Sequence, residues 1–277
     1  MIYGYYNGKF APIDELTVPA LDRAVYFGDG VYDVTTFVNG RFYALDDHLD
    51  RFYSSCELID IDYDLSREQL VEVFTELVRL SQPVGDALIY WQASRGSGIR
   101  EHAYGNEMKP NTLAYCKPIA RTDPFGKISL ITERDIRAEM CNIKTINLIP
   151  SVRAGKKAAD KGCFEAVLYR NGYVTEGSHT SIMLLQNGCL IAHPLTNLIL
   201  PSITRKRVLQ ICEKTGIPTE IREFTVEEML CADEILVGSA TTLVRRASTV
   251  DGKAVGGKGE EVFTKLANAF LKDYTGQ

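Results

Sequence analysis

Apolar and polar residues alternate over short runs in the first part of the chain, which is the period of β-strands. The runs within residues 1–43 are rich in aromatic and β-branched residues. Asn7-Gly8 and Asn39-Gly40 separate them, and this dipeptide is typical of tight hairpin turns. Two further runs of the same kind cover 87–96 and 111–119. We therefore expect an antiparallel sheet built from hairpins.

Two segments between these runs have the spacing of helices instead. Apolar side chains recur at positions 49, 52, 56 and 59, which predicts a helix over 46–59. A second helix is expected to begin at Ser66, which forms a capping-box pair with Gln69, and to run to about residue 80. The first portion of the chain is thus predicted to be α+β, with its helices grouped against an antiparallel sheet.

Residues 119–125 combine proline, mixed charge and little periodicity, so we expect an interdomain linker there. Beyond it, strands are predicted at 127–132 and 141–149, and hairpins at Asn171-Gly172 and Asn187-Gly188. Helices are predicted near 151–161, 202–216 and 259–274, and a further one at Thr225 with Glu228 as its capping partner. The sequence therefore predicts a small domain over 1–118 and a larger domain over 126–277, both α+β.

Composition and charge narrow the class of protein. The chain has 277 residues and a formal net charge of −5, from 31 basic and 36 acidic side chains. This balance argues against a surface for nucleic acid or anionic membranes. The apolar runs are too short to span a bilayer, and the N-terminus lacks the pattern of a signal peptide. We expect a cytoplasmic protein.

Cysteine and histidine give little sign of a metal or a disulfide framework. The seven cysteines are odd in number, widely spaced and without a CxxC pair, so we expect mostly buried, reduced thiols. The four histidines show no metal-ligand spacing such as HExxH. No zinc site is expected.

The predicted strand 141–149 contains one lysine, Lys144, among mostly apolar residues. A lysine desolvated in an apolar pocket is available as a neutral amine for Schiff-base chemistry. A lysine on an edge strand, with its stem on apolar surface and its ammonium in water, would give the same pattern. The local sequence leaves both interpretations open.

Other short motifs carry groups that could bind an anion or a cationic ring. Glu176, in "VTEGSHTS", follows a predicted strand and could pair with a protonated ring nitrogen, or be a solvated hairpin residue. The helix start at Pro201-Ser202 directs the amides of Ile203 and Thr204 outward, and such amides bind anions. A loop of small and hydroxyl residues at 237–242 and an arginine, Arg51, could complete a phosphate site.

The segment "SRGSGIREHAYG" displays Arg95, Arg100 and His102 in a glycine-rich loop. Cationic groups on a loop suit the recognition of a carboxylate, although an ordinary charged loop has the same composition.

These motifs occur in one order along nearly the whole chain, and that order resembles the fold-type IV pyridoxal-phosphate enzymes. The matching segments are "FGDGVYD", "DHLDRF", "NIKTIN", "VTEGSHTS", "LPSITR" and "GSATT". The resemblance implies a small α+β N-terminal domain, a larger pseudo-barrel C-terminal domain and pyridoxal 5'-phosphate as the cofactor.

The resemblance also implies roles for particular residues. Lys144 matches the lysine that forms the Schiff base and moves the proton, and Glu176 matches the partner of the pyridine nitrogen. The phosphate cup would consist of one guanidinium, two amides and two hydroxyl residues: Arg51, Ile203, Thr204, Ser239 and Thr241. Tyr32 matches an active-site tyrosine that faces the substrate. Arg100 and His102 match a pair that binds the substrate α-carboxylate and that the family supplies from the neighbouring subunit, which implies a homodimer.

Within the family, the RxH pair and Ile149, where branched-chain enzymes usually have a tyrosine, favour transfer between a D-amino acid and a 2-oxo acid by a ping-pong mechanism. Aminodeoxychorismate lyase, a branched-chain L-aminotransferase and a catalytically silent cofactor-binding protein are the alternatives. Three departures from the family pattern bear on substrate preference: Pro201-Ser202 before the Ile-Thr pair, His179-Thr180 after Glu176, and Asp33 in place of glutamate.

Overall fold

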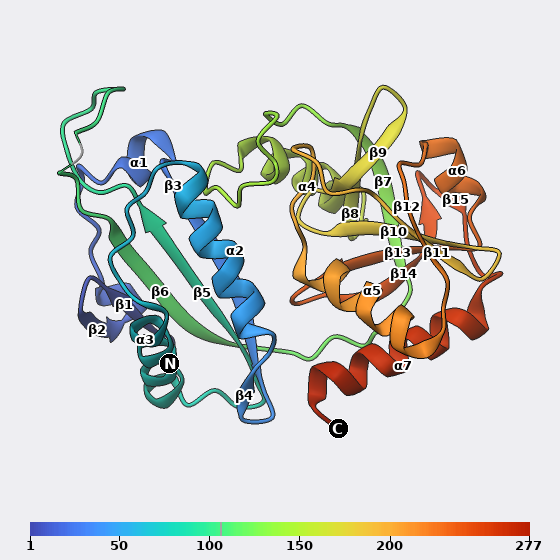
Figure 1. Ribbon diagram of the computed structural model, residues 1–277, viewed down its shortest axis with the longest axis horizontal. Coiled ribbons are helices and arrows are strands. Elements are labelled where there is room, and N and C mark those ends of the chain that lie inside the picture. The colour runs from blue at the N-terminus through green and yellow to red at the C-terminus, as the bar shows by residue number, and fades with distance from the viewer. Residues whose placement is uncertain (106) are drawn as a thin grey trace. The chain divides into compact units, whose positions relative to one another are not determined.

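The computed structural model describes residues 1–105 and 107–277. It divides into two compact units (Figure 1). Unit 1 comprises Met1–Arg121 and Ile143–Asn147, and unit 2 comprises Thr122–Asn142 and Leu148–Gln277. Each unit combines helices with a sheet of its own, so the predicted α+β class is confirmed. Residues 120–127 have no regular secondary structure, whereas Ile119 ends a strand. We propose that the interdomain linker, expected over 119–125, begins at residue 120.

Unit 1 is built on a six-stranded antiparallel sheet of order β2-β1-β6-β5-β3-β4. Its strands are β1 (Tyr3–Tyr6), β2 (Lys9–Pro12), β3 (Gly30–Val38), β4 (Arg41–Phe42), β5 (Asp86–Ser94) and β6 (Asn111–Ile119). The predicted hairpins at Asn7-Gly8 and Asn39-Gly40 are confirmed, and all four residues have positive φ, as this turn requires. A 3-10 turn η1 (Ile13–Glu15) and a short helix α1 (Arg23–Phe27) were not predicted from the sequence.

Two longer helices, α2 (Leu45–Leu58) and α3 (Arg67–Ser81), supply much of the apolar core of unit 1. α2 packs against β3, and α3 packs against β1 and β6. Phe52, Phe74 and Trp91 are fully buried where the helices meet the sheet. The capping box of α3 is present as predicted: the Ser66 hydroxyl accepts from the Gln69 amide, and the Gln69 side chain accepts from the Ser66 amide.

Unit 2 contains a curled, mixed sheet of nine strands (Figure 1). Its order is β12-β11-β10-β13-β14-β7-β8-β9, with β15 paired to β14. The strands are β7 (Ile128–Arg134), β8 (Glu165–Arg170), β9 (Tyr173–Gly177), β10 (Ser181–Gln186), β11 (Cys189–Ala192), β12 (Thr219–Ile221), β13 (Glu234–Ser239), β14 (Leu243–Val250) and β15 (Lys253–Ala254). β7 is parallel to both of its neighbours, β14 and β8, whereas β8–β9 and β10–β11 are the predicted antiparallel hairpins.

Four helices cover this sheet: α4 (Ile149–Asp160), α5 (Ile203–Thr215), α6 (Val226–Cys231) and α7 (Glu260–Thr275). α4 packs against β7 and β8. α5 and α7 pack against each other, and they contact β13 and β14 respectively. α6 begins with the predicted capping box of Thr225 and Glu228. The helical predictions for the second half of the chain are thus confirmed to within about two residues.

The strand predicted at 141–149 is wrong. Residues 141–148 contain no strand, and Ile149 already belongs to α4. The backbone bonds of this segment go to several different partners: the Cys141 amide donates to the Asn197 carbonyl, and the Thr145 amide donates to the Ile143 carbonyl two residues back. A single isolated bridge joins Thr145 to Val31 of β3. Lys144 therefore lies in an irregular segment that touches a strand without being one.

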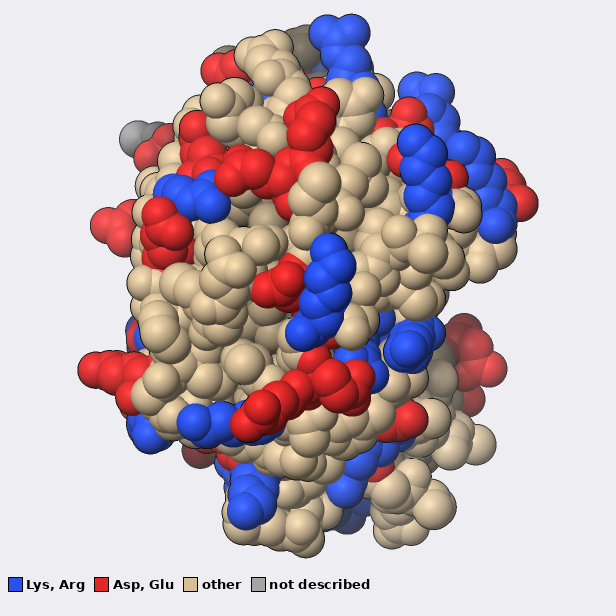
Figure 2. All heavy atoms as spheres, turned by 90° about the vertical axis from the view of Figure 1, so that its right-hand side faces the viewer, with Lys and Arg blue, Asp and Glu red and all other residues tan. Residues whose placement is uncertain are grey.

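The face shown in Figure 2 carries both acidic and basic side chains, and the cysteines are unpaired. On the described atoms of the face in Figure 2, acidic and basic side chains are interspersed and no large patch of one sign forms. Each of the seven cysteines has a free thiol; Cys56, Cys116 and Cys212 are buried and Cys231 is exposed. No helix within residues 1–105 or 107–277 is both long enough and apolar enough to cross a bilayer.

Candidate active site

Lys144 is held in unit 1 by its backbone. The Tyr32 amide donates to the Lys144 carbonyl at 2.9 Å, and the Lys144 amide donates to the Ser55 hydroxyl at 3.3 Å. The lysine is half-buried, and its Nζ lies 4.2 Å from the centre of the Tyr32 ring. The structure thus brings together two residues that the sequence predicted for one site, and the aromatic face stabilises the ammonium.

Tyr32 belongs to a row of tyrosines across three adjacent strands. Its ring stacks on that of Tyr90 with centres 5.6 Å apart, and Tyr90 stacks on Tyr115 at 5.0 Å. Burial, followed by the nearby Tyr32 and Tyr115, raises the pKa of Tyr90 well above its ordinary value. The Tyr90 hydroxyl therefore stays protonated near neutral pH, and the row fixes the ring of Tyr32 beside the lysine.

Arg51 lies in α2 and pairs with Asp33 of β3 through two bonds, Nε to Oδ2 at 2.8 Å and Nη2 to Oδ1 at 2.7 Å. His48, one turn earlier on α2, donates from Nδ1 to the same carboxylate at 2.8 Å. Asp33 is completely buried and His48 is 2% exposed. The bidentate contact fixes the guanidinium of Arg51 in one orientation.

The electrostatics of this cluster follow from its burial. Burial by itself raises the pKa of Asp33, but the charges and hydrogen bonds of Arg51 and His48 outweigh it and lower that pKa well below the ordinary value. Burial lowers the pKa of His48; Asp33 opposes this, while the charges of Arg51 and Lys144 add to it. His48 is therefore neutral at pH 7, and Asp33 is ionised.

From the sequence alone, Asp33 stands out only as a departure from the family pattern. A signal for its role is nevertheless present, because Val31, Asp33 and Thr35 alternate along β3 and so share one face. Since these positions are buried, a carboxylate among them requires a cationic partner.

The loop with the predicted carboxylate-binding pair packs on one aromatic ring. The guanidinium of Arg100 lies 4.9 Å from the Phe27 ring centre, and the His102 ring centre lies 5.3 Å from it. Arg23 supports the loop, since its Nη1 donates to the Glu101 carbonyl at 2.7 Å. The structure therefore brings Arg100 and His102 together.

Arg95 serves a different purpose from its two loop neighbours. It is 7% exposed, pairs with Asp29 and donates to the carbonyls of Ile59 and Asp60. Its guanidinium also lies 3.8 Å from the Tyr104 ring centre. The hypothesis that Arg95 is an exposed cation for a ligand is wrong. Its guanidinium is buried and bonded to other residues of the protein.

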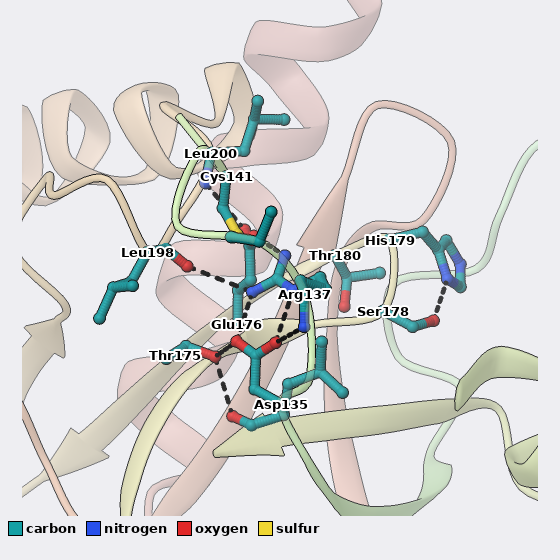
Figure 3. A network of polar contacts seen from close by, with 12 residues as sticks. Asp135, Arg137, Cys141, Thr175, Glu176, Ser178, His179, Thr180, Leu198 and Leu200 are labelled. Atoms are coloured by element: carbon teal, nitrogen blue, oxygen red, sulfur yellow. Dashed lines mark hydrogen bonds and ion pairs between the residues drawn. The ribbon is translucent and has the colours of Figure 1, made fainter. Parts of the chain in front are cut away.

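Glu176 lies in β9 of unit 2 and is 7% exposed (Figure 3). Its Oε1 accepts a short hydrogen bond from Nη1 of Arg137, and its Oε2 accepts from the Leu200 amide at 3.1 Å. Arg137 also contacts Asp135, which accepts from Thr175 as well. The sequence motif identifies the carboxylate but gives no sign of the guanidinium that holds it.

The predicted anion-binding amides also lie in unit 2, at the start of α5. Ser202 caps this helix, since its hydroxyl accepts from the Arg205 amide at 3.2 Å. The first amides of a helix have no acceptor within the helix, which is the basis of the prediction for Ile203 and Thr204. Thr204 lies against Gly238. A Cβ on Gly238 would be 2.9 Å from the methyl group of Thr204.

The second predicted loop, 237–242, is a turn only over 240–242, because residues 237–239 are the end of β13. The Ser239 hydroxyl donates to Thr242 Oγ1 at 2.9 Å and accepts from the Thr242 amide at 3.1 Å. The Thr241 carbonyl accepts from the Thr122 hydroxyl at 2.8 Å. Because Gly238 contacts Thr204, the structure brings this hydroxyl-rich turn and the start of α5 together.

The turn after Glu176 is organised by a buried carboxylate that the sequence motifs do not single out. Glu165 is completely buried and accepts from the Ser178 hydroxyl at 2.6 Å, the Thr180 hydroxyl at 2.8 Å and the His179 ring at 2.9 Å. Burial raises the pKa of Glu165, but hydrogen bonds and charge from His179, Ser178 and Thr180 lower it overall. A side chain at Gly177 would come within 2.2 Å of the Thr180 hydroxyl, so this turn requires glycine.

The chemistry of these groups fits pyridoxal phosphate. The cofactor presents an aldehyde, a basic ring nitrogen and a dianionic phosphate, and these require an amine, a carboxylate and several anion donors. Unit 1 holds the amine of Lys144 and the oriented guanidinium of Arg51; unit 2 holds the carboxylate of Glu176 and the adjoining amides and hydroxyls. No group of three or more metal-ligating side chains occurs in the described part of the chain.

Comparisons with known proteins point in the same direction. The family model described as amino-transferase class IV matches residues 30–250. D-alanine aminotransferase of Bacillus licheniformis is 36% identical over 270 residues, which are 97% of this chain and 95% of that protein.

Two solved structures have the same fold. Branched-chain aminotransferase from Thermoproteus uzoniensis with norvaline superposes with a TM-score of 0.90, at 23% identity, over 99% of this chain and 95% of that one. The branched-chain amino acid aminotransferase from Escherichia coli also gives a TM-score of 0.90, at 20% identity, over 99% of this chain and 94% of that one. Fold, family match and relatives agree: this chain belongs to the class IV aminotransferases.

Proposed function

We propose that this protein transfers an amino group between a D-amino acid and a 2-oxo acid, with pyridoxal 5'-phosphate as its cofactor. The observation that carries the proposal is Lys144: a half-buried amine covered by an aromatic ring, in a chain that is 36% identical to a D-alanine aminotransferase over almost its full length. We further propose that it is a cytoplasmic protein, in keeping with its free thiols. We also propose that it is a homodimer, because the family supplies the carboxylate-binding pair from the neighbouring subunit.

Each end of the cofactor has a candidate partner. Lys144 would hold it covalently, and Glu176 would accept a hydrogen bond from its ring nitrogen. The phosphate would be bound by one guanidinium and a set of amides and hydroxyls: Arg51, Ile203, Thr204, Ser239 and Thr241. When bound, the cofactor supplies an electron sink for the carbanion left by removal of the α-proton.

Lys144 would serve as the general acid–base once the substrate amine has replaced it. Its Nζ would take the proton from the substrate α-carbon and return it to the cofactor carbon that carries the amino nitrogen. One side chain would thus perform both proton transfers. Tyr32 supports this role because its amide fixes the Lys144 backbone and its ring lies beside Nζ.

Arg100 and His102 are proposed to bind the substrate α-carboxylate. Both lie on Phe27, and Arg23 holds the peptide between them, which supports a rigid two-point contact. In the family this pair comes from the neighbouring subunit, so the proposed site is completed by a homodimer. A carboxylate held at a fixed place relative to Lys144 decides which face of the α-carbon meets the base, and hence D or L preference.

A half-reaction screen tests the function. The purified protein, loaded with pyridoxal phosphate, is mixed separately with D-alanine, D-glutamate, L-leucine and L-glutamate, and the visible absorption of the bound cofactor is followed. Loss of that absorption with the D-amino acids alone supports the proposal. Loss with L-leucine would instead indicate a branched-chain enzyme, and release of pyruvate from 4-amino-4-deoxychorismate would indicate the lyase.

Lys144→Ala provides the control. This variant is expected to fold and to retain some cofactor without a covalent bond, while transamination falls by several orders of magnitude. Normal turnover by Lys144→Ala would contradict the assignment. A wild-type protein that takes up the cofactor but reacts with none of the four amino acids would indicate a catalytically silent cofactor-binding chain.

A further inference from the structure

Arg137 lies between two carboxylates in unit 2, with Asp135 on one side and Glu176 on the other (Figure 3). The side chain of Asp135 is fully buried, and those of Glu176 and Arg137 are 9% and 13% exposed. Glu176 is the residue proposed to meet the ring nitrogen. Neither Asp135 nor Arg137 is among the residues proposed to bind the cofactor or the substrate.

Asp135 fixes the guanidinium in place. It accepts from the Arg137 amide at 3.0 Å, from Nε at 3.0 Å and from Nη2 at 2.9 Å. Thr175 donates to the same carboxylate at 3.0 Å, and Arg170 approaches it at 3.2 Å. Nη2 of Arg137 donates in addition to the Leu198 carbonyl at 3.2 Å. These bonds hold the guanidinium in the orientation in which Nη1 points at Glu176.

Both Asp135 and Arg137 are charged in this network. Burial raises the pKa of Asp135, but the hydrogen bonds and charge of Arg137, with help from Arg170, lower it to about 2. Burial alone lowers the pKa of Arg137, and the two carboxylates raise it overall. Asp135 is thus ionised and Arg137 is charged at any physiological pH, so a cation faces Glu176 permanently.

A buried carboxylate without a cationic partner favours its protonated form. A protonated Glu176 could not serve as the charged partner of a proton-bearing ring nitrogen, and the ring would lose its strength as an electron sink. Arg137 removes this difficulty because it provides the counter-charge from the protein itself. The Leu200 amide adds a second donor at Oε2, which fixes the plane of the carboxylate.

We propose that Arg137, anchored by Asp135, is a positioning residue that keeps Glu176 ionised and oriented before any cofactor arrives. The inference rests on the proposed function for the identity of the ligand, but it concerns the state of Glu176 in the protein alone. It extends the site by two residues that act through Glu176.

The test measures protonation directly. Wild type, Arg137→Gln, Arg137→Lys and Arg170→Gln are each loaded with pyridoxal phosphate labelled with ¹⁵N in the ring, and the nitrogen chemical shift is followed from pH 5 to 10. In Arg137→Gln the midpoint for loss of the ring proton is expected to fall by about 1 to 3 pH units. Arg137→Lys keeps a cation and is expected to restore most of the wild-type midpoint.

Arg170→Gln is the matched control. It makes the same substitution and removes a guanidinium from the same carboxylate, Asp135. The other contacts of Arg170 go to Glu139 and to the backbone carbonyl of Arg137. Its midpoint is expected to equal that of wild type. If Arg137→Gln and Arg170→Gln behave alike, Arg137 has only a structural role and the proposal is overturned.

A second measurement needs no variant at Arg137 that could fail to fold. The ¹³C carboxylate signal of Glu176, assigned by its absence in Glu176→Gln, is recorded in cofactor-free wild-type protein between pH 5 and 8. The expected result is an ionised carboxylate throughout. A signal that becomes ionised only when cofactor is added would overturn the proposal. Failure of wild type to bind cofactor would count against the proposed function and leave this result standing.

Discussion

Tyr32 contacts Lys144 twice: its amide donates to the lysine carbonyl at 2.9 Å, and its ring centre lies 4.2 Å from Nζ. The ring contact can be tested separately from the hydroxyl. A cation–π contact contributes about 0.5 to 2 kcal/mol, so Tyr32→Leu is expected to lower kcat/KM about 2- to 30-fold. Tyr32→Phe keeps the ring and should lose less. An equal loss in both variants would assign the effect to the hydroxyl.

Asp33 balances Arg51 inside unit 1, and its removal would leave a buried guanidinium without this counter-charge. Asp33→Asn is therefore expected to lower the free energy of unfolding by about 3 kcal/mol, measured by urea denaturation of cofactor-free protein. Glu76→Gln removes one partner of the exposed pair Glu76–Arg79 and should cause no measurable change. Equal effects of the two variants would contradict the importance of burial at Asp33.

The free energy of unfolding at acid pH should depend on the ionisation of Asp135. Its pKa is about 2 in the folded protein, below the value of 3.8 for the free side chain, because Arg137 outweighs the effect of burial. The stabilisation is thus complete above about pH 4 and is lost as the pH falls toward 2. The difference in unfolding free energy between wild type and Asp135→Asn should shrink over this interval. A difference independent of pH would exclude ionisation of Asp135 as its source.

The cysteines should differ sharply in reactivity. Burial raises the pKa of Cys56 to about 12, and this residue is 2% exposed, whereas Cys231 is exposed. Since the thiolate is the reactive form, a maleimide should label Cys231 in the native protein and Cys56 only after unfolding. Peptide mapping by mass spectrometry checks this. Early labelling of Cys56 would indicate that α2 opens readily in the native state.

Local signals predicted most of the secondary structure. The Asn-Gly hairpins and the capping boxes at Ser66 and Thr225 were found where expected, because each depends on residues within three or four positions of one another. The short helix α1 was missed, since five residues carry too little periodicity to stand out.

The segment around Lys144 shows where such signals fail. Its apolar composition is that of a strand, but apart from the local bond from Thr145 to Ile143 its backbone bonds go to Ser55, Asn197 and β3, which are far away in the sequence. The pairing of Arg137 with Glu176 spans 39 positions, and that of Arg51 with Asp33 spans 18. Only the folded chain brings such partners together, so the sequence could indicate the chemical groups and not their counter-charges.

The bridge between Thr145 and Val31 has a consequence for folding as well as for chemistry. β4 pairs with the end of β3, at Phe37 and Val38, whereas residues 143–147 bond to its beginning through Tyr32 and Gly30. The peptide that carries the lysine therefore also covers a stretch of sheet edge that β4 leaves open. A fragment ending at Arg121 would lack this cover, and its open strand would invite pairing with other chains, so we expect it to aggregate.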